Sequence, residues 1–109
     1  MDDPEVVKAM QYIRDHRNEP MQVAEVTDAT SLSRRTLERR FLKVLDRTVQ
    51  DEINRMRVEQ IARMLLQTHM SPVQIAQTMG YSSPDNMRRF FQRYKKKTPL
   101  QFRRESGHR

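Results

Sequence analysis

The feature that most constrains this chain is an internal repeat of about 50 residues. Residues 26–32 align with residues 75–81 at an offset of 49, and after the turn the offset becomes 50. The aligned pairs are then Ser33 with Ser83, Leu37 with Met87, Arg39 with Arg89, Phe41 with Phe91 and Thr48 with Thr98. Each copy predicts a short helix, a tight turn and a second helix. The coincidence of turn, cap and basic positions favours a duplicated unit over two unrelated helical pairs.

Residues 48–68, between the copies, predict one long linker helix. Apolar residues recur every three to five positions as one helical face requires: Ile53, Met56, Ile61, Met64 and Leu65. We expect the charged residues to turn away from that face: Asp51, Glu52, Arg57, Glu59 and Arg63. Thr48 followed by Asp51 resembles a capping box. About 19 residues at roughly 1.5 Å each give a rod on the order of 28 Å long.

Composition favours an all-α fold of about seven helices. The 109 residues include only two glycines and five prolines, eight methionines and few β-branched runs. The absence of cysteine excludes disulfides and thiolate metal sites, and it fits a cytoplasmic protein. No apolar run approaches the ~20 residues that cross a bilayer.

We expect one domain over residues 1–109, with a first helix-turn-helix subdomain at 4–47, the linker helix at 48–68 and a second helix-turn-helix subdomain at 69–105. Helix starts are predicted at Asp3-Pro4, at Ser33 before a helix over 34–45, and at the capping boxes opened by Ser71 and Thr98. Gly80 is the expected turn residue of the second copy. Residues expected to face the core include Val7, Ala29, Val44 and Tyr94.

Charge is unevenly distributed along the chain. The net charge is +7, but residues 1–30 carry −4, residues 31–48 carry +4, residues 49–68 are neutral and residues 69–109 carry +7. Positive charge therefore collects on the second helix of each copy and on the tail, and nucleic acid is the natural partner. A membrane surface is disfavoured, because the basic segments have no wide apolar side.

The exposed N-terminal end of the helix over 34–45 carries Arg34, Arg35, Glu38 and Arg39. A helix-turn-helix presents this end of its second helix to the major groove. There, arginine can make paired hydrogen bonds to guanine, and glutamate can accept one from cytosine.

These motifs resemble those of the AraC/XylS family of bacterial transcription regulators, whose DNA-binding domain has two helix-turn-helix units joined by a long helix. The resemblance extends from about Val6 to Arg103 and is most specific in the second unit: Ile75-Ala76, Gly80-Tyr81, Ser83, Arg89, Phe91, Tyr94, Thr98-Pro99 and Phe102-Arg103. Within the family, Asp3-Pro4-Glu5-Val6 and Ser33-Arg34 look like the xylose-operon regulator subgroup. The family usually has glycine where Asp46 and Lys96 stand, and Ser31 replaces its turn glycine.

The resemblance implies a base-reading role for six residues: Arg35, Glu38, Arg39, Asp85, Asn86 and Arg89. Phosphate contacts are expected from the other basic residues of the same helices and their exits: Arg34, Arg40, Lys43, Arg47, Arg93, Lys95, Lys96 and Lys97. Asp85 departs from the polar amides common at its position. Phosphate repels its carboxylate, whereas a cytosine amino group could pair with it.

The main hypothesis is therefore a sequence-specific duplex DNA-binding domain of a transcription regulator, inserting two recognition helices into successive major-groove segments and controlling genes of xylose-type sugar use. The alternative is a helical adaptor that docks an acidic protein. An enzyme is disfavoured, because the histidines are scattered and no catalytic pair, phosphate loop or metal spacing occurs. We expect no cofactor and no metal. RNA polymerase is a candidate partner, and the effector-binding, dimerising domain typical of the family is expected to be missing from this chain.

Overall fold

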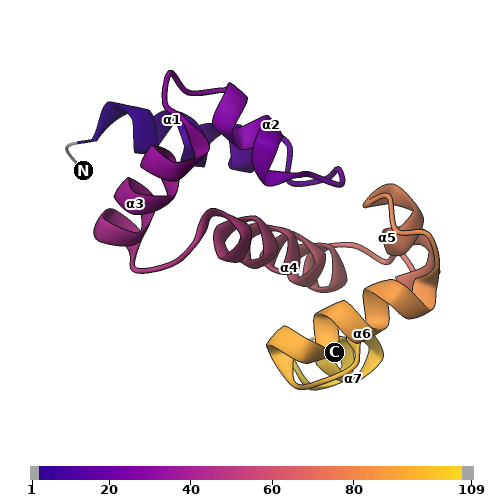
Figure 1. Cartoon of the computed structure of the whole chain (residues 1–109). Coiled ribbons are helices and arrows are strands. Elements are labelled where there is room, and N and C mark those ends of the chain that lie inside the picture. The colour runs from indigo at the N-terminus through magenta and orange to yellow at the C-terminus, as the bar shows by residue number, and fades with distance from the viewer. Residues whose placement is uncertain (1–2, 107–109) are drawn as a thin grey trace. The chain divides into compact units, whose positions relative to one another are not determined.

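The computed structural model describes residues 3–106, and this range forms seven α-helices without a strand (Figure 1). The helices are α1 Pro4–Asp15, α2 Val23–Asp28, α3 Arg34–Leu45, α4 Val49–Gln67, α5 Pro72–Thr78, α6 Pro84–Lys95 and α7 Pro99–Glu105. The expected all-α fold and the helix count are thus confirmed. None of the described helices is long and apolar enough to span a membrane.

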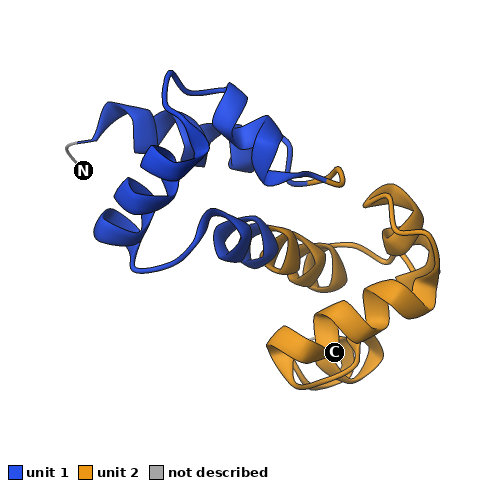
Figure 2. Ribbon diagram, in the orientation of Figure 1, with its two compact units in different colours: residues 1–17, 21–56 blue, residues 18–20, 57–109 orange. Residues whose placement is uncertain are grey.

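The chain divides into two compact units (Figure 2). Unit 1 comprises residues 1–17 and 21–56, and unit 2 comprises residues 18–20 and 57–109. The boundary falls within α4, whose residues up to Met56 belong to unit 1 and whose residues from Arg57 belong to unit 2. The short segment 18–20 belongs to unit 2 although it follows α1 directly.

Each unit has its own apolar core. The buried residues of unit 1 come from α1, α2, α3 and the start of α4: Val6, Ala9, Ile13, Val23, Val26, Leu37, Phe41, Val49 and Ile53. Those of unit 2 come from the rest of α4 and from α5 and α6: Val58, Ile61, Ala62, Leu65, Ile75, Ala76, Met79, Met87 and Phe91. Phe102 of α7 meets Phe91 edge to face, with ring centroids 5.3 Å apart. The repeat thus packs two small cores rather than one.

Side-chain caps start most of these helices, as the sequence predicted. The caps of α1, α3, α5, α6 and α7 are Asp3, Ser33, Ser71, Ser83 and Thr98. For α4, Thr48 Oγ1 accepts from Asp51 N at 3.0 Å while Thr48 N donates to Asp51 Oδ2 at 3.2 Å, which confirms the Asp variant of the capping box. One box was missed: Gln22 and Glu25 start α2.

Four residues expected to face the core are exposed: Val7, Ala29, Val44 and Tyr94. In α1 the buried face runs through Val6 and Ala9, and Val7 lies one position off it. In α3 the face passes through Leu37 and Phe41, so that Val44 falls toward its edge with 37% of its surface exposed. Ala29 is the C-cap of α2, where the packed face has already ended.

Two charged residues of α4, by contrast, are buried where the sequence predicted outward positions. Glu52 is 2% exposed, and its carboxylate accepts from Arg47 at 2.6 Å and from Arg55 at 2.9 and 3.0 Å. Arg57 is 6% exposed, and it donates to the backbone oxygens of Glu19, at 2.6 Å, and Met79, at 2.9 Å. Burying a charge is tolerated when it is paired and hydrogen-bonded in this way.

Candidate nucleic-acid interface

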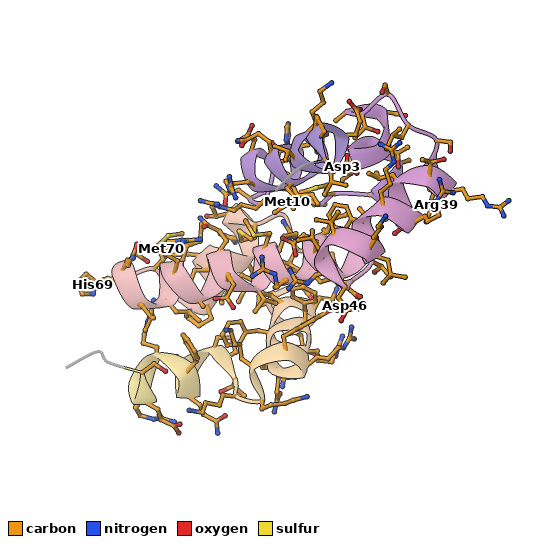
Figure 3. The ribbon with its side chains drawn as sticks, turned by 90° about the vertical axis from the view of Figure 1, so that its left-hand side faces the viewer. Asp3, Met10, Arg39, Asp46, His69 and Met70 are labelled. Atoms are coloured by element: carbon orange, nitrogen blue, oxygen red, sulfur yellow. The ribbon has the colours of Figure 1, made fainter. Side chains whose placement is uncertain are left out.

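The first helix-turn-helix consists of α2 and α3, and its second helix begins with an exposed basic end. Ser33 Oγ accepts from Thr36 N at 3.2 Å and thereby fixes the start of α3. Three arginines follow on the exposed surface: Arg34, Arg35 and Arg39. Their guanidinium groups form no hydrogen bond or ion pair within residues 3–106, and Figure 3 shows Arg39 extending away from the ribbon. They are therefore available to an anionic partner.

Glu38, predicted to read bases from α3, has a partner inside unit 1. Its Oε1 accepts from Val49 N at 3.1 Å, and its side chain is half-buried. The carboxylate thereby satisfies one of the backbone N–H groups that a helix start leaves open, here at the first residue of α4. Sequence spacing gave no signal for this contact.

The second helix-turn-helix consists of α5 and α6, and the start of α6 carries a connected polar cluster. Asp85 Oδ1 accepts from Arg88 Nη2 at 2.6 Å and from Arg88 Nε at 3.0 Å. Asp85 Oδ2 accepts from Arg89 Nη1 at 2.6 Å, while Arg89 Nη2 donates to Asn86 Oδ1 at 2.7 Å. Asn86 Nδ2 in turn donates to Ser82 Oγ at 2.5 Å. All three predicted base-reading residues of this unit thus belong to one exposed network.

The ionisation of Asp85 follows from this cluster. Hydrogen bonding to Arg88, together with the positive charges of Arg88 and Arg89, lowers the pKa of the Asp85 carboxyl below its usual value. The carboxylate is therefore ionised at neutral pH, and it balances part of the charge that α6 would otherwise present to DNA.

Most residues predicted to contact phosphate are paired within their own units. Ion pairs join Arg40 to Asp3 at 3.6 Å, Arg47 to Glu52 at 2.6 Å, Lys95 to Glu59 at 2.8 Å and Lys97 to Glu105 at 2.8 Å. Lys96 Nζ donates to Arg93 O at 3.0 Å. The side chains of Arg34, Lys43 and Arg93 have no such partner in the described part of the chain. The pairs of Arg40, Lys95 and Lys97 lie at the surface, contribute little and exchange readily for phosphate, whereas Arg47 pairs with the buried Glu52.

The turn of the first unit is held by a carboxylate that sequence analysis missed. Glu5 Oε1 accepts from Ser31 N at 2.7 Å and from Ser31 Oγ at 2.9 Å, while Glu5 Oε2 pairs with Lys8 at 3.1 Å. The backbone hydrogen bond from Ser31, followed by the contact with Lys8, lowers the pKa of Glu5 to about 2. Ser31 stands where the family usually has glycine, and Glu5 stabilises this turn.

The turn of the second unit has a different construction. Gly80 adopts φ +79°, as predicted, and a Cβ there would lie 2.7 Å from Pro20 Cδ. Tyr81, the next residue, packs its ring 5.0 Å from the guanidinium carbon of Arg57. Glycine is therefore required both by the left-handed backbone and by the close approach of proline.

A groove of about 310 Å³ lies beside the start of α6. Its walls are mostly apolar and come from the first residues of three helices in unit 2: Pro72, Pro84, Asp85, Met87, Arg88, Thr98, Pro99 and Leu100. Residues 3–106 contain no group of three or more histidine and acidic side chains that could hold a metal ion.

Comparison with known proteins identifies relatives that contain helix-turn-helix domains. A family model described as a helix-turn-helix domain matches residues 26–105. The chain is 34% identical over 101 residues to the xylose operon regulatory protein of Escherichia coli strain K12, covering 93% of this chain and 26% of that protein.

Two solved structures share the fold. One is of a xylose-binding transcription activator, with a TM-score of 0.88 and 31% identity over 99% of this chain and 28% of the other. The second is the DNA-binding domain of the global transcriptional factor AdpA in complex with a target DNA, with a TM-score of 0.83 and 24% identity over 94% of this chain and 92% of that one. At that identity the second likeness concerns the fold alone.

Proposed function

The chain belongs to the AraC-type helix-turn-helix family of transcription-regulator DNA-binding domains, and on this premise we propose that it reads duplex DNA with both α3 and α6. The observation that carries the proposal is the repeated construction of these helices. Each starts at a serine cap, fully buries a large apolar residue at its fourth position, Leu37 or Met87, and exposes arginines on its first turns. Exposed arginines at the start of such a helix suit the major groove.

Base readout is proposed for five residues at the starts of α3 and α6: Arg35, Glu38, Arg39, Asn86 and Arg89. Asp85, the sixth residue predicted to read bases, pairs with Arg88 and Arg89 instead. Arg35 and Arg39 have the least to lose on binding, since no internal contact must be broken. Glu38 would have to exchange its bond with Val49 N for a cytosine amino group.

Phosphate contacts are proposed for the surrounding basic residues: Arg34, Arg40, Lys43, Arg47, Arg93, Lys95, Lys96 and Lys97. Such contacts fix register on the duplex without reading sequence. The weak surface ion pairs at several of them make exchange for phosphate inexpensive.

In this proposal the linker helix joins the two readers. α4 is a continuous helix of 19 residues with a capping box at its start. At about 1.5 Å per residue it is on the order of 28 Å long.

The wider role proposed is control of sugar-utilisation genes, of the xylose type, in the cytoplasm of a bacterium, where the nucleoid supplies the duplex. The chain spans 26% to 31% of the length of the curated relatives it matches. We therefore propose an upstream effector-binding and dimerising domain in the complete regulator, and RNA polymerase as a partner at the promoter.

Selection of bound sites from a random duplex library tests the proposal, followed by a salt titration of the selected site. We expect a recovered consensus long enough for two half-sites about one helical turn apart. We also expect a log–log salt slope of roughly −0.9 for each phosphate contacted. Absence of duplex binding at low salt would favour the protein adaptor, and a consensus of a single half-site would contradict reading by both helices.

A further inference from the structure

Asp85 is an acidic residue at the centre of a surface expected to bind a polyanion. Its side chain is 54% exposed, and those of Arg88 and Arg89 are 46% and 60% exposed. The cluster therefore lies at the solvent-facing start of α6, in the region assigned to DNA. An acid in the first turn of a helix is favoured by the helix dipole, but Asp85 also pairs with both arginines of the surface assigned to DNA.

The geometry leaves the arginines able to bind while fixing their direction. Arg89 uses two of the five N–H donors of a guanidinium, one to Asp85 and one to Asn86, and three remain. Arg88 likewise uses Nε and Nη2 on a single carboxylate oxygen. A bidentate contact with guanine needs two donors, so the clamped Arg89 still has enough.

The same carboxylate weakens the attraction of these arginines to phosphate. An arginine without a fixed direction can contact phosphate as well as a base edge, and its phosphate contacts add affinity without selectivity. An ionised Asp85 repels phosphate and competes for the same donors. The matched position of the first unit is Arg35, so α3 has the opposite sign there.

We propose that Asp85 is a positioning residue that determines specificity: it directs Arg88 and Arg89 away from phosphate and toward base edges, so that α6 contributes selectivity more than affinity. This inference rests on the proposed DNA-binding function. In this arrangement Asp85 itself contacts no base, in contrast to the base-reading role that the sequence analysis predicts for it. Ion pairs at exposed helix positions are weak, so Asp85 orients the arginines without preventing their use.

The variant Asp85→Asn tests the inference, because it keeps the shape of the side chain and removes its charge. Affinity for a random-sequence duplex and for the selected site is measured by fluorescence anisotropy across a salt series. We expect Asp85→Asn to bind random duplex about five-fold more tightly and to steepen the log–log slope by about one, the value for one added phosphate contact. The ratio of specific to non-specific affinity should fall about three-fold or more.

The control variant is Asp15→Asn, an exposed acid at the end of α1 outside both recognition helices. It makes the same change in net charge, and we expect less than about a two-fold change in either affinity. Equal effects of the two variants would overturn the inference in favour of a general charge effect. Circular dichroism verifies that both variants keep the helical fold.

Two further results would overturn the role of Asp85. Unchanged random-duplex affinity and salt slope in Asp85→Asn would show that the carboxylate does not restrain the arginines. If Asp85→Asn loses its base preference at only one position of the selected site, Asp85 reads that base directly. Wild-type protein that selects no site contradicts the proposed function, and the inference with it, whereas selective wild-type binding with an unchanged ratio in Asp85→Asn contradicts the inference alone.

A second measurement follows the clamp itself. In nitrogen-15 spectra of the free wild-type protein, the Nε–H of Arg88 should be protected from exchange with water because it donates to Asp85. Asp85→Asn should remove this protection. An Arg88 signal that is equally unprotected in both proteins would contradict the clamp.

Discussion

At the start of α3, Arg35 and Arg39 have no partner within residues 3–106, whereas at the start of α6 an acid, Asp85, pairs with both neighbouring arginines. The helices nevertheless share a serine cap, a twelve-residue length and a buried phenylalanine. A duplicated fold therefore does not require duplicated electrostatics. Its core positions are fixed by packing, but its exposed positions are free to differ.

The two recognition helices also differ in how they contact the helix that follows each of them. Glu38 caps the first residue of α4 through Val49 N, and the residues matched to this pair in the second unit are Arg88 and Pro99. Proline has no N–H to donate, so a carboxylate at position 88 would have nothing to accept there. The basic residue at that position is thus free to join Asp85.

The largest expected effect tests whether the matched cores are equally important. Phe41→Ala and Phe91→Ala should each lower the free energy of unfolding by about 3–5 kcal/mol, because both side chains are fully buried. Urea denaturation followed by circular dichroism measures the loss. A loss below 1 kcal/mol in either variant would contradict the equivalence of the two cores.

The next effect concerns base reading by the matched arginines. Arg39→Ala and Arg89→Ala should each relax discrimination in one half of the selected site by about 1–3 kcal/mol. Lys96→Ala, at the exit of α6, should weaken all sequences alike. Binding to a panel of single-base site variants measures this, and a uniform loss from Arg39→Ala would falsify its base-reading role.

Glu38→Ala sharpens the comparison of the helix exits. Loss of the bond to Val49 N should cost about 1 kcal/mol of stability, as other helix-start caps do. Arg88→Ala should cost less, because its position supports no cap. Unchanged stability would contradict the capping role, and a lost preference at one base pair of the selected site would separately support base reading by Glu38.

A smaller effect is expected at the two left-handed exits. Asp46 and Lys96 have φ of 57° and 64°, and lysine is less comfortable there than aspartate. Lys96→Gly should raise the free energy of unfolding by up to about 1 kcal/mol, whereas Asp46→Gly should be near neutral because the flexibility of glycine offsets its gain. Equal stabilisation by Lys96→Gly and Asp46→Gly would contradict the expected difference between lysine and aspartate at these C-caps.

The turns give the last comparison, in the pH dependence of stability. The pKa of Glu5 falls from 4.5 in its unperturbed state to about 2 in the folded protein. The stabilisation from ionised Glu5 is therefore complete above pH 4.5 and is lost as the pH falls toward 2. Glu5→Gln should melt below wild type at pH 7, and the difference should shrink toward pH 2. A difference that is constant with pH would contradict this role.

Local sequence signals predicted most of the fold. The caps at Ser33, Ser71 and Thr98 and the positive φ of Gly80 were confirmed, since each depends on residues only a few positions away. The same signals missed the Gln22 box, because glutamine is an uncommon cap. Edges of helix faces were the weak point, and Val7 and Val44 were wrongly assigned to the core.

The candidate interface was only partly predictable. The sequence identified the exposed arginines of α3 and α6. Which of them contact bases and which contact phosphate stays a prediction. The partners of Asp85 lie three and four residues away on the same helix, a spacing that sequence does show. This spacing allows the ion pairs to form, but the same spacing is compatible with unpaired arginines.

The sequence by itself therefore determined the repeat, the helices, their caps and the separation of charge, because these depend on spacing and on neighbours within one or two helical turns. Only the tertiary structure decided the partners of Glu5, Glu38 and Arg57, which lie 26, 11 and 38 positions away along the chain. A charged side chain finds its lowest free energy with whichever polar group the folded backbone brings near, and that group is chosen by packing rather than by sequence separation.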